Sequence, residues 1–197
     1  MTLVELYNRA CDSGANTAGK NTQYTISSDE QNVYLSIQGS CDDDDWSFNF
    51  DFAVKPYKRM AVRWFAHRGF VTAWKLAREQ IMAELEPVIR GSGKRLVILG
   101  YSHGAALAVV AHEDFKFNGY EPKTHAFGCP RVLWMPSKKI RERFSGVTLY
   151  QSRGDLVTHV PFVIMGFRHV GKVLKFGPKR PITHLPHTLP NYRSILA

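Results

Sequence analysis

The sequence contains few cysteines and no long apolar stretch. Its three cysteines (Cys11, Cys41 and Cys129) are odd in number and never form a C-x-x-C pair, which argues against a disulfide framework and against a zinc site. No apolar run approaches the length of a membrane-spanning helix, and the acidic N-terminal stretch lacks the basic start of a signal peptide. No N-x-S/T glycosylation sequon occurs. We therefore expect synthesis in the cytoplasm, folding in a reducing compartment and free cysteines.

Acidic residues are scarce over most of the chain. Residues 1–51 hold nine acidic and two basic residues, whereas residues 52–197 hold eight acidic and twenty-four basic residues. The two parts therefore carry net charges of −7 and +16, and such an asymmetry suggests an interaction surface. An anionic membrane or micelle surface is a candidate partner, and solubility alone explains the charge equally well. Nucleic acid is not expected, because no recognised nucleic-acid-binding motif occurs.

The length and composition indicate one globular domain over residues 1–197. Hydrophobic residues make up 44% of the chain, which is enough for a substantial core. Strand-like apolar segments alternate with segments of helical spacing, which is typical of an α/β fold with a mostly parallel sheet and helices on both faces. Strands are expected at 24–28, 33–37, 96–99, 124–127 and 147–151, a hairpin strand at 167–176, and helices at 3–11, 70–89, 105–111, 137–144 and 192–196. Residues 55–63 are expected to form a loop or an edge strand.

The segment LVILGYSHGAALA, residues 96–108, is the most informative stretch. Four apolar residues form a short strand, and Gly100, Ser102 and Gly104 then form G-x-S-x-G before an alanine-rich helix. Small residues beside the serine allow a strained strand-to-helix turn that exposes a nucleophilic hydroxyl. G-x-S-x-G alone also occurs by chance as a glycine-containing turn, but the strand before it and the helix after it favour a nucleophile. We therefore predict that Ser102 is a catalytic nucleophile.

A candidate acid follows the serine in the chain. Asp155 comes after an expected strand and a glycine, a position that is typical of an ordinary turn residue and also of the acid of a catalytic triad. The order of Ser102, Asp155 and a later histidine is that of α/β-hydrolases. In such a triad the neutral imidazole takes the serine proton, and the carboxylate orients and stabilises the imidazolium.

Four histidines follow Asp155, and two of them, His184 and His187, share a proline-rich final loop. His159 is close to the acid in sequence, and His169 lies in an expected strand, where a structural role is more common. The spacing of His184 and His187 is also compatible with a metal site, but no further ligands adjoin them. The residues alone therefore leave the base open between His184 and His187, and we expect neither a metal nor a cofactor.

Seven segments in the right order resemble the class 3 lipases, the fungal triacylglycerol lipase type of α/β-hydrolase. They are IQGS at 37–40 followed by D-W-x-x-N at 45–49, HRGFVTAW at 67–74, GYSHGAALA at 100–108, FGCPRV at 127–132, GDLVTHVP at 154–161, FRHVGKV at 167–173 and HTLPNY at 187–192. HTLPNY is similar to the family's H-x-x-x-x-Y, and this match selects His187 as the base. The resemblance implies an α/β-hydrolase fold and a triad of Ser102, Asp155 and His187.

The resemblance also implies an oxyanion hole and a lid. By position, the backbone amides of Ser40 and His103 would form the oxyanion hole, and the segment 41–56 would be the lid. The four aspartates at 42–45 in that segment could equally cap a helix. A calcium site is not expected, because the glycine and glutamate of an EF-hand loop are missing. Departures from the family pattern occur at Gln38, His103, Ala105 and Thr158; the one at His103 leaves the amide in place but changes the acyl pocket.

The leading hypothesis is therefore a serine hydrolase that cleaves acyl esters, those of lipids or glycerides, through an acyl-enzyme on Ser102. The alternative is a catalytically idle relative that binds anionic lipid or nucleic acid through its basic part. The chain keeps all three residue types of the triad, and this favours the enzyme.

Overall fold

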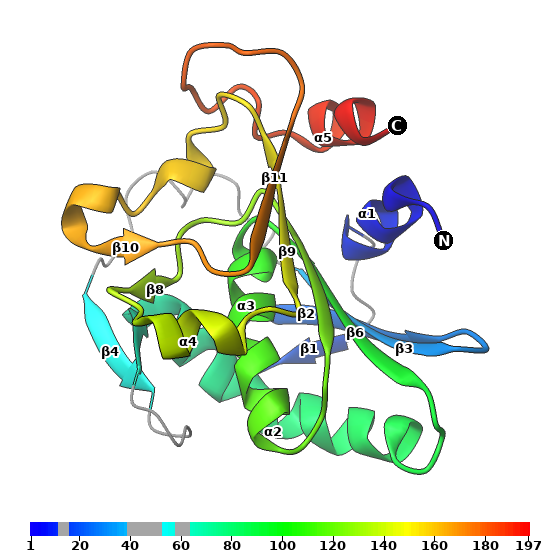
Figure 1. Cartoon of the computed structure of the whole chain (residues 1–197). Coiled ribbons are helices and arrows are strands. Elements are labelled where there is room, and N and C mark those ends of the chain that lie inside the picture. Colours follow the sequence, from blue (N-terminus) through cyan, green and yellow to red (C-terminus); the bar gives the residue numbers. More distant parts are fainter. Residues whose placement is uncertain (12–15, 39–52, 58–63) are drawn as a thin grey trace.

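The computed structural model describes residues 1–11, 16–38, 53–57 and 64–197, which form an α/β structure with helices on both sides of a central sheet (Figure 1). This sheet has seven strands in the order β1-β2-β3-β6-β7-β9-β11. The strands from β3 to β11 are parallel to one another, and β1 and β2 add an antiparallel edge. The predicted mostly parallel α/β fold is thus confirmed.

The elements occur close to where the sequence predicts them. The strands of the central sheet are β1 (Asn16–Ala18), β2 (Thr22–Ser28), β3 (Asn32–Ile37), β6 (Arg95–Tyr101), β7 (Lys123–Phe127), β9 (Val147–Ser152) and β11 (Lys172–Phe176). The helices are α1 (Leu3–Cys11), α2 (Arg68–Ile89), α3 (His103–Phe117), α4 (Lys138–Arg143) and α5 (Leu189–Leu196). All five predicted helices are present, and α3 extends beyond its predicted bounds at both ends.

The side chains of β6 show how both faces of the sheet are covered. Leu96 and Ile98 belong to the hydrophobic core that contains the buried residues of α2 and α3, whereas Val97 and Leu99 belong to a second cluster with α1 and α5. A parallel strand that is covered on both faces has a continuous apolar sequence. This is why the apolar run in residues 96–99 predicts the strand correctly.

Helix α3 is buried from Gly104 to Phe115, including three consecutive polar residues at 112–114. Each of these polar side chains has a partner. His112 Nδ1 lies 2.9 Å from Thr124 Oγ1, Glu113 accepts from Arg143 Nε at 2.6 Å, and Asp114 accepts from Trp74 Nε1 at 2.9 Å and pairs with Arg78. These contacts connect α3 to α2, β7 and α4 and hold the helix that follows the candidate nucleophile.

A second sheet, which the sequence does not predict, lies beside the first. It has four antiparallel strands in the order β10-β8-β5-β4, with bounds β4 (Val54–Tyr57), β5 (Trp64–His67), β8 (Leu133–Trp134) and β10 (Phe167–Arg168). Strands of two to four residues are too short to show an alternating pattern. Strand β4 contains Pro56 and lies at the edge of this sheet, in agreement with the edge-strand alternative.

The expected hairpin strand at 167–176 is wrong. The segment forms two strands in different sheets, because β10 pairs with β8 and β11 pairs with β9. The chain turns between them at Gly171, where φ is 78° and a Cβ would lie 2.4 Å from the carbonyl oxygen of Val147. Only glycine fits such a turn, so the residues before and after it pair with different strands.

Helices α1 and α5 contact each other on one face of the sheet (Figure 1). The Tyr7 hydroxyl donates to the carbonyl oxygen of Leu189 at 3.0 Å, and the ring of Tyr7 stacks with that of Tyr192 at a centroid distance of 6.1 Å. The first described helix therefore supports the last one.

Within the described ranges, no helix is long and apolar enough to cross a membrane. Neither Cys11 nor Cys129 forms a disulfide bond within the described residues. Cys41 lies outside the described residues.

Candidate active site

Ser102 lies at the sharp turn between β6 and α3. Its φ and ψ are 55° and −120°, a strained conformation for a residue with a side chain. Its N–H donates to the carbonyl oxygen of Phe127 on β7 at 2.9 Å, which fixes the turn against the neighbouring strand. The strand, turn and helix that the sequence predicts around this serine are all present.

Gly100 and Gly104 are required by close backbone contacts. A Cβ at Gly100 would lie 2.4 Å from the carbonyl oxygen of Gly104, and a Cβ at Gly104 would lie 2.1 Å from the carbonyl oxygen of Ile37. No side chain fits at these distances. The two glycines therefore allow the end of β3 to approach the turn that carries Ser102.

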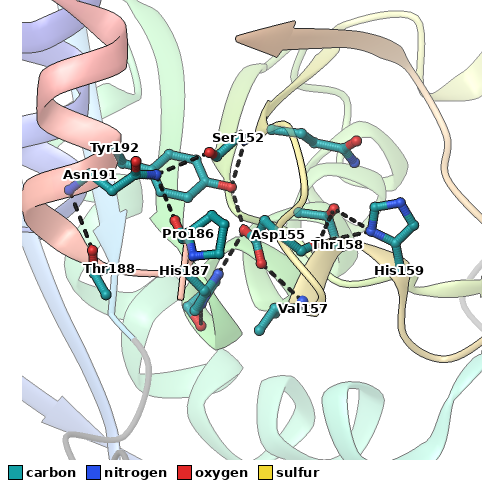
Figure 2. Close-up of polar contacts among 12 residues, drawn as sticks. Ser152, Asp155, Val157, Thr158, His159, Pro186, His187, Thr188, Asn191 and Tyr192 are labelled. Carbon is teal, nitrogen blue, oxygen red and sulfur yellow. Dashed lines mark hydrogen bonds and ion pairs between the residues drawn. The ribbon is translucent and has the colours of Figure 1, made fainter. Parts of the chain in front are cut away.

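His187 connects the serine to Asp155, although the three residues are far apart in the sequence. Its Nε2 lies 2.7 Å from Ser102 Oγ, and its Nδ1 lies 2.8 Å from Asp155 Oδ2 (the second contact is drawn in Figure 2). The Asp155 side chain is fully buried, and that of His187 is 13% exposed. An ionised carboxylate only accepts hydrogen bonds, so Nδ1 carries the proton and Nε2 accepts from the serine hydroxyl. The structure thus brings the three predicted residues together.

Asp155 receives hydrogen bonds on both of its carboxylate oxygens (Figure 2). Oδ1 accepts from the N–H of Val157 at 2.9 Å, and Oδ2 accepts from the Tyr192 hydroxyl at 2.6 Å as well as from His187. The Tyr192 hydroxyl in turn accepts from the N–H of Ser152 at 3.0 Å. Burial and the neighbouring carboxylate raise the pKa of Tyr192, so its phenol keeps the proton that it donates. Tyr192 therefore fixes the carboxylate that orients His187.

Two further residues shape the position of the imidazole. The ring of Tyr101 stacks on that of His187, with centroids 5.1 Å apart and an angle of 15° between the planes. A Cβ at Gly128, where φ is 60°, would lie 2.9 Å from His187 Cε1, so this glycine provides room for the ring. The sequence alone indicates no role for Tyr101 or Gly128, and Tyr192 serves there only to identify the base. Contacts between distant segments leave no local pattern in the sequence. The signal that these three residues do leave is their position within the segments that resemble the family.

The loop that carries His187 is attached to the turn that carries Asp155. The N–H of Thr183 donates to the carbonyl oxygen of Gly154, and the N–H of Leu156 donates to that of Thr183, both at 2.8 Å. His184 lies in the same loop but is exposed, and its carbonyl oxygen accepts from the N–H of His187 at 2.9 Å. Of the two histidines that the residues alone left open, His187 is the one whose ring contacts Ser102 in the structure.

The other histidines after the acid contact the main chain. Nδ1 of His159 lies 2.8 Å from the backbone oxygen of Asp155, and Nε2 of His169 lies 2.8 Å from that of Thr158. Burial lowers the pKa of His169 to about 4, in keeping with a neutral structural residue. Among the residues that the structure describes, no group of three or more His, Cys, Asp or Glu side chains is arranged to hold a metal ion.

His103 follows the serine as the first residue of α3. The first N–H groups of an α-helix have no acceptor within the helix and lie at the positive end of its dipole. The imidazole of His103 lies 5.5 Å from the ring of Phe70 on α2, and burial lowers its pKa to about 4. The side chain is therefore neutral at pH 7. Ser40, the other residue expected in the oxyanion hole, lies outside the described residues, as do residues 41–52 of the expected lid.

Comparison with known protein families decides the relationship. The family described as Lipase (class 3) matches residues 34–165, which is the larger part of the chain. The chain belongs to the class 3 lipase family. The matched range contains Ser102 and Asp155, while His187 lies beyond it. Membership of this family supports a hydrolase.

Two relatives of this class 3 lipase come from filamentous fungi. Secreted mono- and diacylglycerol lipase A of Penicillium cyclopium is 31% identical over 140 residues, which cover 70% of this chain and 46% of the relative. Secreted mono- and diacylglycerol lipase 1 of Fusarium solani is 27% identical over 139 residues, which cover 70% of this chain and 41% of the relative. The chain thus spans about half the length of the relatives that it matches.

Solved structures of fungal lipases share the fold. The Rhizomucor miehei lipase in its propeptide complex gives a TM-score of 0.74 at 17% identity and covers 88% of this chain and 67% of that one. Another fungal lipase structure gives a TM-score of 0.71 at 21% identity, with 95% and 82% covered. This chain therefore has the α/β-hydrolase fold of these structures.

Proposed function

We propose that this class 3 lipase is a serine carboxylic-ester hydrolase that forms an acyl-enzyme on Ser102. The observation that carries the proposal is the continuous series of contacts from Ser102 Oγ through His187 to the buried Asp155, at 2.7 and 2.8 Å. Both distances lie in the range that general acid–base catalysis requires. Membership of a lipase family agrees with this chemistry.

In the proposed reaction, the Ser102 oxygen attacks the ester carbonyl carbon while His187 Nε2 takes the hydroxyl proton. Asp155 keeps the proton on Nδ1 and stabilises the imidazolium. His187 then gives the Nε2 proton to the alkoxide that leaves, and the acyl group remains on Ser102. A water molecule, deprotonated by His187, attacks the acyl-enzyme, and the fatty acid and the free serine are released.

The tetrahedral intermediates of this reaction carry an oxyanion that requires hydrogen-bond donors. We propose the N–H of His103 as one donor, because it is the first amide of α3 and adjoins Ser102. The second donor would be the N–H of Ser40, as the resemblance to the family implies. The reaction in this form uses no metal ion and no cofactor.

We propose acylglycerols or related acyl lipids as the substrate class. The matched fungal relatives are named mono- and diacylglycerol lipases. Beside the nucleophile, the neutral ring of His103 lies 5.5 Å from the ring of Phe70. The residue next to Ser102 therefore adds no charge that would oppose an acyl chain.

We also propose that the segment 41–56 is a lid. Its last residues, from Val54, belong to β4, and its earlier part combines four aspartates with aromatic residues, a composition that suits an apolar cleft in water. If the aspartates hold the lid closed through exposed ion pairs, the effect is screened by salt. Replacing Asp42–Asp45 by asparagine should then raise the hydrolysis of soluble short esters at low salt, and an unchanged rate would contradict this account.

Ser102→Ala tests the proposed function most directly. The experiment measures hydrolysis of nitrophenyl esters of increasing chain length, emulsified glycerides and phospholipids. Ser145→Ala is the control, because Ser145 is exposed and its N–H bonds to the carbonyl oxygen of Glu142 rather than to a residue of the triad. Loss of the nucleophile should lower the rate by several powers of ten, while the control keeps its activity. A serine-reactive phosphonate should label the wild type once, at Ser102. Absence of both labelling and hydrolysis in the wild type would refute the proposal.

A further inference from the structure

Exposed apolar side chains are concentrated in one part of the molecule. Among the described residues, thirteen large hydrophobic side chains are exposed, and eight of them lie in residues 156–197. Four of the eight are consecutive, at 162–165, and we call Phe162–Met165 the apolar loop. Ile164 in this loop is 94% exposed, more than any other large apolar side chain in the described ranges. Apolar surface concentrated in this way marks an interaction site.

The apolar loop has a fixed conformation. The carbonyl oxygen of Met165 accepts from Trp134 Nε1, and that of Gly166 accepts from the N–H of Met135, both at 3.0 Å. The side chain of Met135 is itself 65% exposed and adds to the apolar surface beside the loop. A loop that is already ordered loses little conformational entropy when it binds.

Two arginines hold the backbone of the apolar loop. Nη1 of Arg131 donates to the carbonyl oxygen of Pro161 at 3.0 Å, and Nη1 of Arg168 donates to that of Val163 at 2.6 Å. Burial and the charge of Arg168 lower the pKa of Arg131, because the two cations are close together. Neither forms an ion pair with a carboxylate of the described residues. Two neighbouring cations of this kind attract an anion.

The part of the chain that contains the apolar loop is also positively charged. Residues 156–197 contain six basic residues and no acidic residue. Most of the exposed apolar surface therefore lies in a segment that would be attracted to a negatively charged partner.

This segment also carries the candidate catalytic base. In Figure 1 the gold to red part of the chain, after β9, forms β10 at the left, β11 through the middle and α5 near the top, whereas α2 lies at the bottom. The backbone hydrogen bonds between Thr183 and the turn at Asp155 join the loop that carries His187 to the start of the segment. The apolar loop therefore follows, after a short stretch of chain, the turn to which His187 is bonded.

We propose that the apolar loop inserts into an anionic lipid bilayer, with Arg131 and Arg168 facing the lipid phosphates. Aliphatic side chains beside cations are the combination that lies at the interface of a membrane with anionic lipids. The use of such binding rests on the proposed function, because a bilayer would present acyl lipids to Ser102. Binding itself requires no hydrolysis and can be measured separately.

Two other occupants fit the surface less well. Proteins that bind single-stranded nucleic acid stack successive bases on several aromatic rings, whereas the apolar loop has one aromatic side chain, that of Phe162, beside the aliphatic Val163 and Ile164. A second copy of the chain would bring two basic segments together, and like charges oppose that contact.

Vesicle co-sedimentation of the full chain tests the proposal. All proteins carry Ser102→Ala, so that the lipid is not consumed, and the vesicles are pure phosphatidylcholine or phosphatidylcholine with phosphatidylserine. Each Val or Ile side chain that enters the bilayer should contribute about tenfold to binding. We therefore expect the double variant Val163→Ser/Ile164→Ser to lower the partition coefficient at least about tenfold on each kind of vesicle to which the parent protein binds. Arg168→Gln should lower it about fivefold, and only on the anionic vesicles.

Matched controls come from the opposite part of the molecule. Leu76 and Val88 on α2 are 51% and 41% exposed, close to the 45% of Val163, so Leu76→Ser/Val88→Ser removes similar apolar surface elsewhere. Arg90 on the same side pairs with Glu86, and Arg90→Gln is the control for the charge. Both controls should bind anionic vesicles as the parent protein does, and circular dichroism should show that all variants are folded.

The outcomes separate this proposal from the proposed function. Selective loss of binding in the apolar-loop and Arg168 variants supports the bilayer surface, even if the wild type hydrolyses no ester. The proposal is overturned if the parent protein does not bind anionic vesicles or if the α2 controls lose as much binding. It is also overturned if a short DNA duplex binds the protein and binding to vesicles does not depend on Val163 and Ile164.

Discussion

Asp155 and Asp114 are both fully buried carboxylates, but their partners differ in charge. Asp114 on α3 is paired with the guanidinium of Arg78, a permanent cation. Asp155 instead contacts the imidazole of His187 and the protonated phenol of Tyr192. The network around Asp114 stays between the helices, whereas the network around Asp155 leads to Ser102.

This is the difference expected between a structural carboxylate and the acid of the proposed triad. The charge of Asp114 is compensated in the resting protein, and removing one partner of a buried ion pair destabilises the fold. The charge of Asp155 gains a cation only when His187 accepts a proton, so its electrostatic stabilisation is strongest in the transition state. Burial alone therefore does not identify a catalytic acid, but the charge of its neighbour does.

The largest effect should come from removing the imidazole. His187→Ala should lower kcat/KM for a soluble ester by about 10⁴- to 10⁶-fold, because nothing then accepts the serine proton. His184→Ala should keep most of the activity, since its side chain is exposed and its backbone contact is retained. Steady-state kinetics of the two variants measure this. If His184→Ala were inactive and His187→Ala active, the base would be His184.

The two carboxylates should respond in opposite ways to the same change. Asp155→Asn should lower kcat by about 10⁴-fold, because the amide favours the wrong tautomer of His187. Asp114→Asn should instead leave the activity of the folded enzyme intact and lower the free energy of unfolding by about 3 kcal/mol or more, because Arg78 loses its counter-charge. Steady-state kinetics and urea unfolding of both variants measure these effects. If both variants lost activity and stability to the same extent, the distinction between the two carboxylates would be wrong.

Acid should weaken the region around α3 through the buried His112. Burial lowers the pKa of His112 to about 3, whereas an unfolded histidine titrates near pH 6.5. The unfolded state therefore binds the proton first, and stability is lost as the pH falls below about 6.5. Glu113 opposes this trend, because burial raises its pKa.

His112→Asn isolates the contribution of His112 to the pH dependence of stability, because the amide can still bond to Thr124 but does not titrate. Between about pH 7.5 and pH 5, its free energy of unfolding should fall by roughly 2 kcal/mol less than that of the wild type. Urea unfolding at the two pH values measures this. An equal fall in both proteins would show that His112 does not contribute.

The smallest effect should come from the hydroxyl that fixes Asp155. Tyr192→Phe removes the hydrogen bond to Oδ2 and should lower kcat about tenfold with KM nearly unchanged, because one bond of roughly 1.4 kcal/mol that orients the triad is lost. Tyr150→Phe, which removes a hydroxyl bonded to His125, is the control and should not affect kcat. If both variants behaved alike, Tyr192 would have only a structural role.

Much of the fold can be predicted from local sequence patterns. The apolar run of β6 and the helical spacing of α2 depend on burial by neighbouring layers, so they are visible in the sequence. Strands β8 and β10 have only two residues each, and no periodicity reveals them. Gly171 divides a segment that looks like one strand, because its conformation depends on a contact with Val147 far along the chain.

The candidate site is predictable in part for a related reason. Ser102 lies in a compact motif, and Asp155 and His187 follow from their order and the family resemblance. Tyr192, Tyr101 and Gly128 act through contacts with His187 or Asp155 that exist only in the folded chain. Residue types at fixed spacing can indicate a reaction, whereas the side chains that position the reacting groups are apparent only from the structure.

The contact between α1 and α5 has a consequence for the time at which the site forms. A ribosome makes α1 first among the described elements and α5 last, and the Tyr7 hydroxyl binds the carbonyl oxygen of Leu189 at the start of α5. His187 and Tyr192 leave the exit tunnel of the ribosome after every strand of the described residues. We therefore expect the proposed ester hydrolysis to be absent from the nascent chain until α5 has left the ribosome, because neither the proposed base nor the tyrosine that fixes Asp155 has emerged before then.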